Sequence, residues 1–294
     1  MRVCVTGAAS HLAHALLPAL CARPEVETVI GLDLRPTGFV HPKLTHYIAD
    51  LRAPHHHWLA GCDALVHLAF VVLRGHMPAH TMRAINVEAT QRLFETAARM
   101  GIARLVHLSS AAVYGHGENL TEDAPLSPLP GFLYAAHKAM LEAWFEDCLP
   151  QAVRLRPHAI LGPCCQPLLR TLLRLPLGVA LAKSSPRLQC VHEQDVVAAI
   201  LAVLFAPGDV RGPYNLAAPG YFTLDDLGRR LRLPPPVARG LLYTAWRLTG
   251  FGGEPDWVAG LSHSLTLDCS RARLQLAWQP RHDVRATLAA IMAP

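Results

Sequence analysis

The sequence contains no continuous apolar run long enough to cross a bilayer. Residues 168–181 are mostly apolar, but Arg170, Arg174 and Pro176 interrupt them, and a spanning helix needs about 20 apolar residues. Met1 leads directly into a strand-like run, without the cationic stretch and hydrophobic segment of an export signal. These absences predict a cytoplasmic protein with no stable membrane insertion.

The cysteines lack the spacing of metal ligands. Eight are scattered along the chain: Cys4, Cys21, Cys62, Cys148, Cys164, Cys165, Cys190 and Cys269. Adjacent cysteines rarely form a relaxed disulfide, so reduced thiols fit Cys164 and Cys165 best. The three consecutive histidines at 55–57 have no acidic or cysteine partner nearby, and we predict no metal site.

Basic residues are not gathered into a patch. Lys and Arg number 27 against 22 Asp and Glu, a formal charge of +5. No basic run alternates with aromatic residues, so binding of nucleic acid is not expected. The 294 residues are 51% hydrophobic, which is enough to bury a sizeable core.

Short apolar runs alternate with helix-length segments through the first half of the chain. The predicted strands are residues 2–6, 28–33, 47–49, 64–68, 104–108 and 152–155, and the predicted helices are residues 11–21, 78–100 and 132–148. Apolar strands separated by helices form parallel sheets that are covered on both faces. We therefore predict an α/β fold, a Rossmann-type doubly wound parallel sheet.

The regular alternation of predicted strands and helices ends after Pro157. We interpret residues 1–157 as a dinucleotide-binding domain and residues 158–294 as a smaller, mostly helical substrate lobe. Extended pieces at 188–191, 214–216 and 265–268 predict that part of residues 190–217 returns to the sheet. Residues 238–249 form an amphipathic helix, which we expect to pack its Leu and Trp stripe in the lobe. Attachment of this helix to a membrane surface is the alternative.

The turn after the first strand has the residues of a phosphate-binding loop. Gly7 permits a tight turn, Ser10 allows close approach of a phosphate, and Ala13 allows tight packing of helix and strand. Two of the three expected glycines are replaced, so an ordinary strand–turn–helix is the alternative. Asp33 ends the second strand, where a carboxylate binds the adenosine ribose and favours NAD; Arg35 keeps NADP open.

Tyr134 and Lys138 lie four residues apart in a predicted helix, and hence on one face. A phenol titrates at about 10, and a nearby ammonium together with an oxidised nicotinamide favours the phenolate. Such a pair can shuttle a proton during alcohol–ketone interconversion; a half-buried Tyr beside a surface Lys is the alternative. Ser109 and Ser110 end the fifth strand, where one hydroxyl can bind the substrate oxygen.

These motifs together resemble the extended short-chain dehydrogenase/reductase family, the NAD-dependent epimerase/dehydratase group. Its T-G-x-x-G-x-x-G loop corresponds to residues 6–13, S-S-x-x-V-Y-G to 109–115 and Y-x-x-x-K to 134–138, and further matches follow in order at 155–163, 191–196 and 277–280. The resemblance implies that Ser110, Tyr134 and Lys138 are catalytic. It implies the following cofactor-binding residues: Gly7, Ser10, His11, Leu12, Asp33, Asp50, Leu51, Leu68, Ala69, Asn86, Tyr134, Lys138 and Pro157.

Absent residues narrow the chemistry within this family. Its dehydratases carry an Asp–Glu pair where this chain has Ala111 and Ala112, and a methyl group cannot act as an acid or base, so water elimination is not expected. Many nucleotide-sugar epimerases carry an Asn where this chain has Ala159, and a basic residue from which Arg187 is offset by one.

Three functions stay open at this stage. The resemblance favours a nucleotide-sugar epimerase-like enzyme, with an enzyme like hydroxysteroid dehydrogenase, acting on an apolar alcohol or ketone, as the alternative. A sensor that binds NAD(P) without turnover is the third. In each case NAD and a small-molecule ligand are expected, as is a homodimer formed through the helices on either side of the fifth strand.

Overall fold

The computed structural model describes residues 1–54, 56–73, 75–165, 170, 177–179, 185–227, 231–249, 260 and 262–292. Its central sheet consists of β1 (Arg2–Thr6), β2 (Thr28–Asp33), β3 (Leu44–Ile48), β4 (Ala64–His67), β5 (Arg104–Leu108), β7 (Val153–Pro157) and β11 (Gly212–Leu216). The strand order is β11-β7-β5-β4-β1-β2-β3, and all neighbours are parallel. The chain reverses its direction of winding between β1 and β4, which confirms the predicted doubly wound Rossmann-type sheet.

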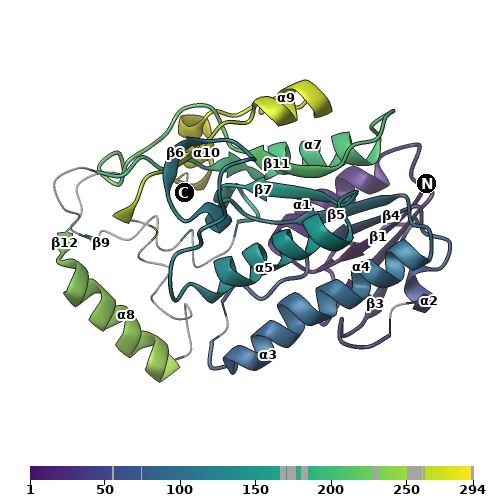
Figure 1. Cartoon of the computed structure of the whole chain (residues 1–294), viewed down its shortest axis with the longest axis horizontal. Coiled ribbons are helices and arrows are strands. Elements are labelled where there is room, and N and C mark those ends of the chain that lie inside the picture. The colour runs from purple at the N-terminus through teal and green to yellow at the C-terminus, as the bar shows by residue number, and fades with distance from the viewer. Residues whose placement is uncertain are drawn as a thin grey trace.

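Helices cover both faces of this sheet (Figure 1). On one face, α1 (His11–Cys21) and α7 (Glu193–Leu204) share a core with Val3 and Val5. On the other face, α4 (Ala89–Arg99) and α5 (Leu133–Cys148) pack on Cys4 and Leu65. Successive residues of β1 thus enter opposite cores, because side chains alternate along a strand.

Two predicted elements differ from the observed ones. The third strand begins at Leu44 rather than at residue 47, because this edge strand packs Leu44 against the core and leaves Ile48 exposed. The helix predicted at 78–100 is α3 (Ala79–Arg83), a π-helical segment (Ala84–Glu88) and α4. Asn86 in this segment is fully buried and exchanges hydrogen bonds of 2.8 and 2.9 Å with the backbone of Val71.

The remaining elements are short and lie mostly beyond the carboxyl edge of the sheet. They are α2 (His56–Leu59), a 3-10 turn (Ala111–Tyr114), β6 (Gly117–Leu120), β8 (Ile160–Leu161), β9 (Leu177–Val179), β10 (Val191–His192), β12 (Leu231–Leu233), α8 (Pro235–Thr249), β13 (Leu265–Leu267), α9 (Ser270–Leu276) and α10 (Val284–Met292). β10 pairs with β8, β12 with β9, and β13 with β6. Most of the apolar stretch 168–181, and the first histidine of 55–57, lie outside the described residues.

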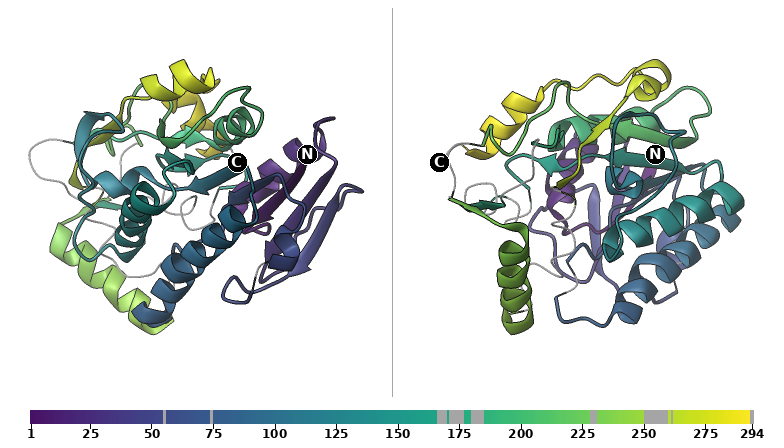
Figure 2. Two further views of the ribbon diagram at one scale, coloured as in Figure 1. Left: turned by 45° about the vertical axis from the view of Figure 1, so that its right-hand side comes forward. Right: turned by 60° about the vertical axis from the view of Figure 1, so that its left-hand side comes forward.

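The second half of the chain also contributes to the central sheet and to the helices that cover it. α7 packs beside α1, and β11 extends the sheet next to β7, whereas α8 lies at the edge of the molecule, outside both helix layers (Figure 2). A division into domains at residue 157 stays a prediction. Within the described ranges, no helix combines the length and the apolar character that crossing a bilayer requires.

Candidate active site

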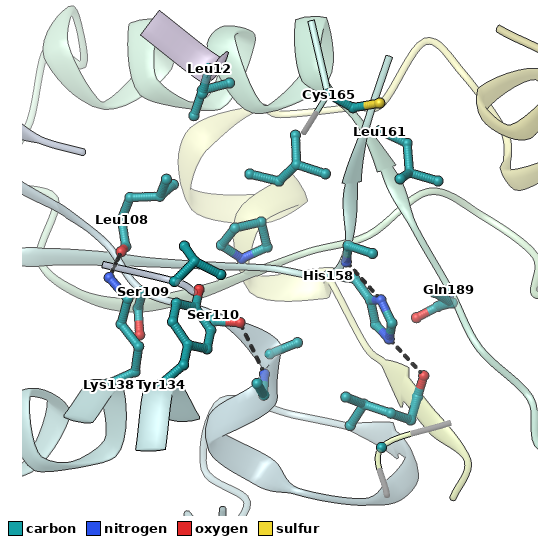
Figure 3. Close-up of a pocket in the computed structure, with 18 of the residues that line it drawn as sticks. Leu12, Leu108, Ser109, Ser110, Tyr134, Lys138, His158, Leu161, Cys165 and Gln189 are labelled. Carbon is teal, nitrogen blue, oxygen red and sulfur yellow. Dashed lines mark hydrogen bonds between the residues drawn. The ribbon is translucent and has the colours of Figure 1, made fainter. Parts of the chain in front are cut away.

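The carboxyl ends of β1, β4, β5 and β7 open into one pocket of ≈ 500 Å³. Ser110, Tyr134 and Lys138 meet there, with Tyr134 and Lys138 on α5 below the end of β5 (Figure 3). The predicted site residues that line this pocket are Ser10, His11, Leu12, Leu68, Ser110, Tyr134, Lys138 and Pro157. Ligands bind at this edge of doubly wound sheets because the loops there diverge from the reversal point.

The other predicted cofactor residues are not part of the pocket lining: Gly7, Asp33, Asp50, Leu51, Ala69 and Asn86. Gly7 has a φ of +72°, and a Cβ at this position would stand 2.5 Å from the backbone nitrogen of Ala69. Glycine is therefore required by conformation and by space, and it lets the turn after β1 approach the end of β4.

The first turn of α1 fits a bound phosphate although two glycines are replaced. Ser10 is its N-cap, with its Oγ accepting a hydrogen bond of 3.4 Å from the Ala13 amide. In the described part of the chain, the amides of His11 and Leu12 have no acceptor. Free amides and the positive end of the helix dipole are what a pyrophosphate binds.

Two of the predicted cofactor residues are carboxylates. Asp33 accepts hydrogen bonds of 3.0 Å from the amides of Ala9 and Arg35, so it fixes the turn that follows β1. Arg35 also donates to the carbonyl of Ala9 at 3.3 Å. Asp50 forms an ion pair of 2.6 Å with Arg52, whose hydrogen bonds lower the pKa of Asp50.

Burial and the Ser110 hydroxyl together determine the pKa of the Tyr134 phenol. Burial raises the pKa of Tyr134, and a hydrogen bond with the Ser110 hydroxyl opposes this effect. The Ser110 Oγ also accepts the Ala112 amide at 3.2 Å, which caps the 3-10 turn and fixes the hydroxyl. Ser109 also lines the pocket, and its Oγ is buried without a partner among the described residues.

Lys138 does not point at the phenol. Its Nζ donates to the Leu108 carbonyl at 2.5 Å, lies 3.4 Å from the ring centre of Phe70 and is 5.9 Å from the ring centre of Tyr134. Burial holds the pKa of Lys138 well below its ordinary value. In this arrangement burial dominates the pKa of Tyr134. That Lys138 together with an oxidised nicotinamide favours the phenolate stays a prediction.

His107 is a residue of the site that the sequence patterns did not indicate. His107 is fully buried, and its Nε2 is 3.5 Å from the Nζ of Lys138. Burial, followed by the charge of Lys138, holds the pKa of His107 well below its ordinary value, so the imidazole is neutral. The available signal was alternation along β5, which turns His107 towards the face that α5 covers.

The substrate side of the pocket is apolar. Its lining includes Ala111, Ala112, Leu129, Phe132, Ile160, Leu161, Cys165, Leu188, Phe222, Leu224 and Leu265. Among the described residues that line the pocket, Lys138 is the only Lys or Arg.

The polar side chains on the substrate side of the pocket form hydrogen bonds with other groups of the protein. His158 accepts the Ala159 amide at 2.8 Å and contacts the Leu265 carbonyl at 3.0 Å, and burial lowers its pKa to about 4. Gln189 donates to the Gly220 carbonyl at 3.0 Å and accepts the Leu267 amide at 2.7 Å. Glu193 accepts the Cys164 amide. Among the described residues of the pocket wall, the Ser109 Oγ is thus the buried side-chain oxygen without a hydrogen-bond partner.

No group of three or more His, Cys, Asp or Glu in the described ranges could hold a metal ion. His56 and His57 lie in α2, where their rings face each other edge to face at 5.5 Å.

Comparison with known proteins finds relatives whose names refer to a sterol, to a farnesylated quinoline and to a nucleotide sugar. The "Sterol demethylase protein B" of Methylococcus capsulatus is 29% identical over 267 residues, 82% of this chain and 80% of that protein. A 4-hydroxy-2-methyl-3-oxo-4-farnesyl-3,4-dihydroquinoline-1-oxide ketoreductase of Stigmatella aurantiaca is 31% identical over 180 residues, 55% of this chain and 51% of that protein. The solved structure of DesIV, a dTDP-glucose 4,6-dehydratase from Streptomyces venezuelae with NAD and TYD bound, is 26% identical. It covers 99% of this chain and 96% of its own, with a TM-score of 0.71.

The family match spans the sheet and its loops. Residues 3–217 match the family described as NAD dependent epimerase/dehydratase, a range that runs from β1 to β11 and contains Ser110, Tyr134 and Lys138. The family uses NAD, and the resemblance first suggested by short motifs is confirmed. This chain belongs to the NAD dependent epimerase/dehydratase family.

Proposed function

We propose that this protein is an NAD-dependent oxidoreductase that interconverts a secondary alcohol and a ketone on an apolar substrate without a phosphate group. The observation that carries this proposal is the apolar substrate side of the pocket, whose polar side chains are already hydrogen-bonded within the protein. A diphosphate placed there would lose its hydration without gaining cationic partners among the described residues. The names of the sterol and farnesyl-quinoline relatives agree with this chemistry.

The residues of the cofactor side fit NAD. Gly7 and the capped first turn of α1 would hold the pyrophosphate, and Asp33 would accept the ribose hydroxyls and disfavour a 2′-phosphate. Pro157 and Leu68 line the same pocket beside the catalytic side chains. When bound, NAD supplies the oxidised nicotinamide that accepts a hydride, and NADH supplies the hydride in reverse.

Tyr134 would act as the acid and base of the reaction. In the direction of ketone reduction, the phenol donates its proton to the substrate oxygen while hydride adds to the carbonyl carbon. Ser110 donates a hydrogen bond to the same oxygen and stabilises the negative charge that develops on it. Because burial raises the pKa of Tyr134, the phenol is protonated at neutral pH, which suits reduction.

A nucleotide-sugar epimerase is the second candidate, supported by the likeness to a dTDP-glucose 4,6-dehydratase over nearly the whole chain. In such an enzyme hydride leaves and returns to one sugar, so no NADH accumulates. Ala111 and Ala112 provide no acid or base for loss of water, and they oppose the dehydratase reaction itself.

Purified protein distinguishes these candidates. With NAD, a panel of apolar secondary alcohols including a 3β-hydroxysterol is expected to yield NADH in proportion to the ketone formed. UDP-glucose is expected to yield neither NADH nor an epimer. Conversion of UDP-glucose to UDP-galactose without NADH would show the epimerase instead, and NAD binding without turnover of any substrate would show a sensor.

A further inference from the structure

The helix α8 presents an apolar stripe to solvent. Val237, Leu241 and Leu248 are 48%, 58% and 78% exposed. Their spacings of four and seven residues place them on one side of the helix. The expectation that this helix packs its Leu and Trp stripe within the lobe is therefore wrong for Leu241 and Leu248. The side chains of Leu242 and Trp246 lie outside the described ones. A contiguous exposed apolar stripe indicates a contact surface.

The charged residues in the sequence of α8 have one sign. Residues 235–249 contain Arg239 and Arg247 and no Asp or Glu. Arg247 is exposed, and its guanidinium lies 5.9 Å from the ring centre of Tyr243, which is itself 47% exposed. An apolar stripe accompanied by arginine and an aromatic ring is the pattern of helices that lie in the interface of an anionic bilayer.

The position of α8 connects it with the pocket. Leu224 precedes the helix and Gly260 follows it, and both line the pocket. The chain therefore leaves the pocket wall, forms α8 at the edge of the molecule and returns to the wall (Figure 2). The helix has 15 residues, and a helix of this length lies on a bilayer rather than crossing it.

We propose that α8 is a membrane-docking helix that inserts its Val237, Leu241 and Leu248 stripe into the surface of a bilayer containing anionic phospholipid. In this position the pocket exchanges its substrate with the lipid phase, where an apolar alcohol or ketone is concentrated. The exchange of substrate rests on the proposed function, whereas the docking itself does not.

Flotation with lipid vesicles tests the docking. The full-length protein is mixed with vesicles of phosphatidylcholine alone or with phosphatidylglycerol added. Wild type is expected to float with the anionic vesicles and much less with the neutral ones. Leu241→Asp/Leu248→Asp is expected to lower the bound fraction at least about tenfold. The matched control is Leu274→Asp, since Leu274 is 84% exposed on α9 and is expected to float as wild type does.

Several results would overturn the docking: wild type that stays with the soluble fraction, a double variant that floats as well as wild type, or a control that is lost equally. Loss of a concentration-dependent dimer in the double variant, without vesicle binding by wild type, would assign the stripe to a second copy of the chain. Circular dichroism and NAD binding check that the double variant is folded. Turnover of an apolar ketone in detergent is measured separately, so failure of docking and failure of the proposed function are distinguishable.

Discussion

At the scale of single residues, the environment of each side chain decides its chemistry. Tyr134 has Phe70 edge-on at 5.5 Å between ring centres and a hydroxyl partner in Ser110. Burial raises its pKa, so the phenol is a proton donor at neutral pH. Lys138 is held against Phe70 and the Leu108 carbonyl, and His107 behind it is neutral.

Tyr134→Phe removes the proposed proton donor while keeping the ring and its packing. We expect kcat to fall about a thousandfold, and we expect the dissociation constant of NAD to change by less than about twofold, because the phosphate loop is untouched. Steady-state kinetics and calorimetry measure the two quantities. The control is Tyr221→Phe, which changes an exposed tyrosine. Activity of Tyr134→Phe close to wild type would remove Tyr134 from the mechanism.

The pH profile tests how Ser110 acts on Tyr134. Alcohol oxidation needs the phenolate, so its rate should rise as pH increases towards the pKa of Tyr134, whereas ketone reduction should decline over the same range. Ser110 lowers this pKa, so Ser110→Ala should move both profiles to higher pH, besides reducing the rate. Initial rates between about pH 8 and about pH 11 check this, because burial raises the pKa of Tyr134 above the ordinary value of about 10. Profiles that keep their midpoint in Ser110→Ala would contradict the hydrogen bond.

At the scale of elements, a buried polar network fixes the catalytic helix. Glu142 of α5 is buried and accepts hydrogen bonds of 2.9 and 2.8 Å from Arg156 of β7. Arg156 also donates to the Tyr114 hydroxyl at 2.6 Å, which in turn donates to Asn215 of β11 at 2.8 Å. Because Glu142 lies one turn beyond Lys138, this network holds α5, and hence Tyr134 and Lys138, the proposed catalytic residues, against β7 and β11.

Arg156→Met leaves the carboxylate of Glu142 buried, and the cation that remains beside it among the described residues is Arg154, at 3.4 Å. We expect the free energy of unfolding to fall by about 3 kcal/mol, since breaking a buried ion pair leaves an uncompensated charge. Urea denaturation measures this loss. Adding Glu142→Gln in the same chain should recover part of it by removing the charge. An unchanged midpoint in Arg156→Met would show that the network contributes nothing to stability.

The same scale shows where sequence patterns were sufficient. Strands and helices that are buried on one or both sides, such as β1, α1 and β5, have the predicted bounds, because burial imposes an apolar pattern. The start of the edge strand β3 and the π-helical segment were not predicted. An apolar pattern in the sequence specifies neither of them. β3 is half exposed. The π-helical segment contains Asn86, whose hydrogen bonds go to the backbone of Val71, 15 residues away in the sequence.

At the scale of the whole molecule, the packing of imidazoles makes stability depend on pH. Burial is the main cause that lowers the pKa of His107, His137, His158 and His192. Each folded-state pKa lies below that of the unfolded chain, so the unfolded chain binds more protons as pH falls below about 6.5. The neutral imidazoles therefore contribute full stability above about pH 6.5 and lose it progressively towards lower pH. Glu193, with a raised pKa, works in the opposite sense.

Urea denaturation between about pH 7.5 and about pH 5 checks this dependence. The free energy of unfolding should stay level down to about pH 6.5 and fall below it, and His158, with a folded pKa of about 4, should account for about 2 kcal/mol of the loss at about pH 5. His158→Gln should flatten the slope, since a glutamine side chain cannot take up this proton. A wild-type stability that stays constant over the range would contradict the burial of these imidazoles.

The sequence by itself determined the fold class, the family and part of the pocket lining. Alternating apolar strands and helices specify a doubly wound sheet, and a sheet of this kind brings the ends of β1, β4, β5 and β7 together whatever the loops contain. Motif spacing was therefore enough to select Gly7, Ser110, Tyr134 and Lys138.

Only the tertiary structure decided the orientation, protonation and hydrogen bonding of those side chains. The direction of the Lys138 ammonium, the neutral His107 and the saturated polar groups of His158 and Gln189 depend on partners from distant strands and loops. The exposure of Leu241 and Leu248 likewise depends on where α8 lies. The sequence shows how residues are spaced along one element, whereas burial and hydrogen bonding result from elements that meet across the fold.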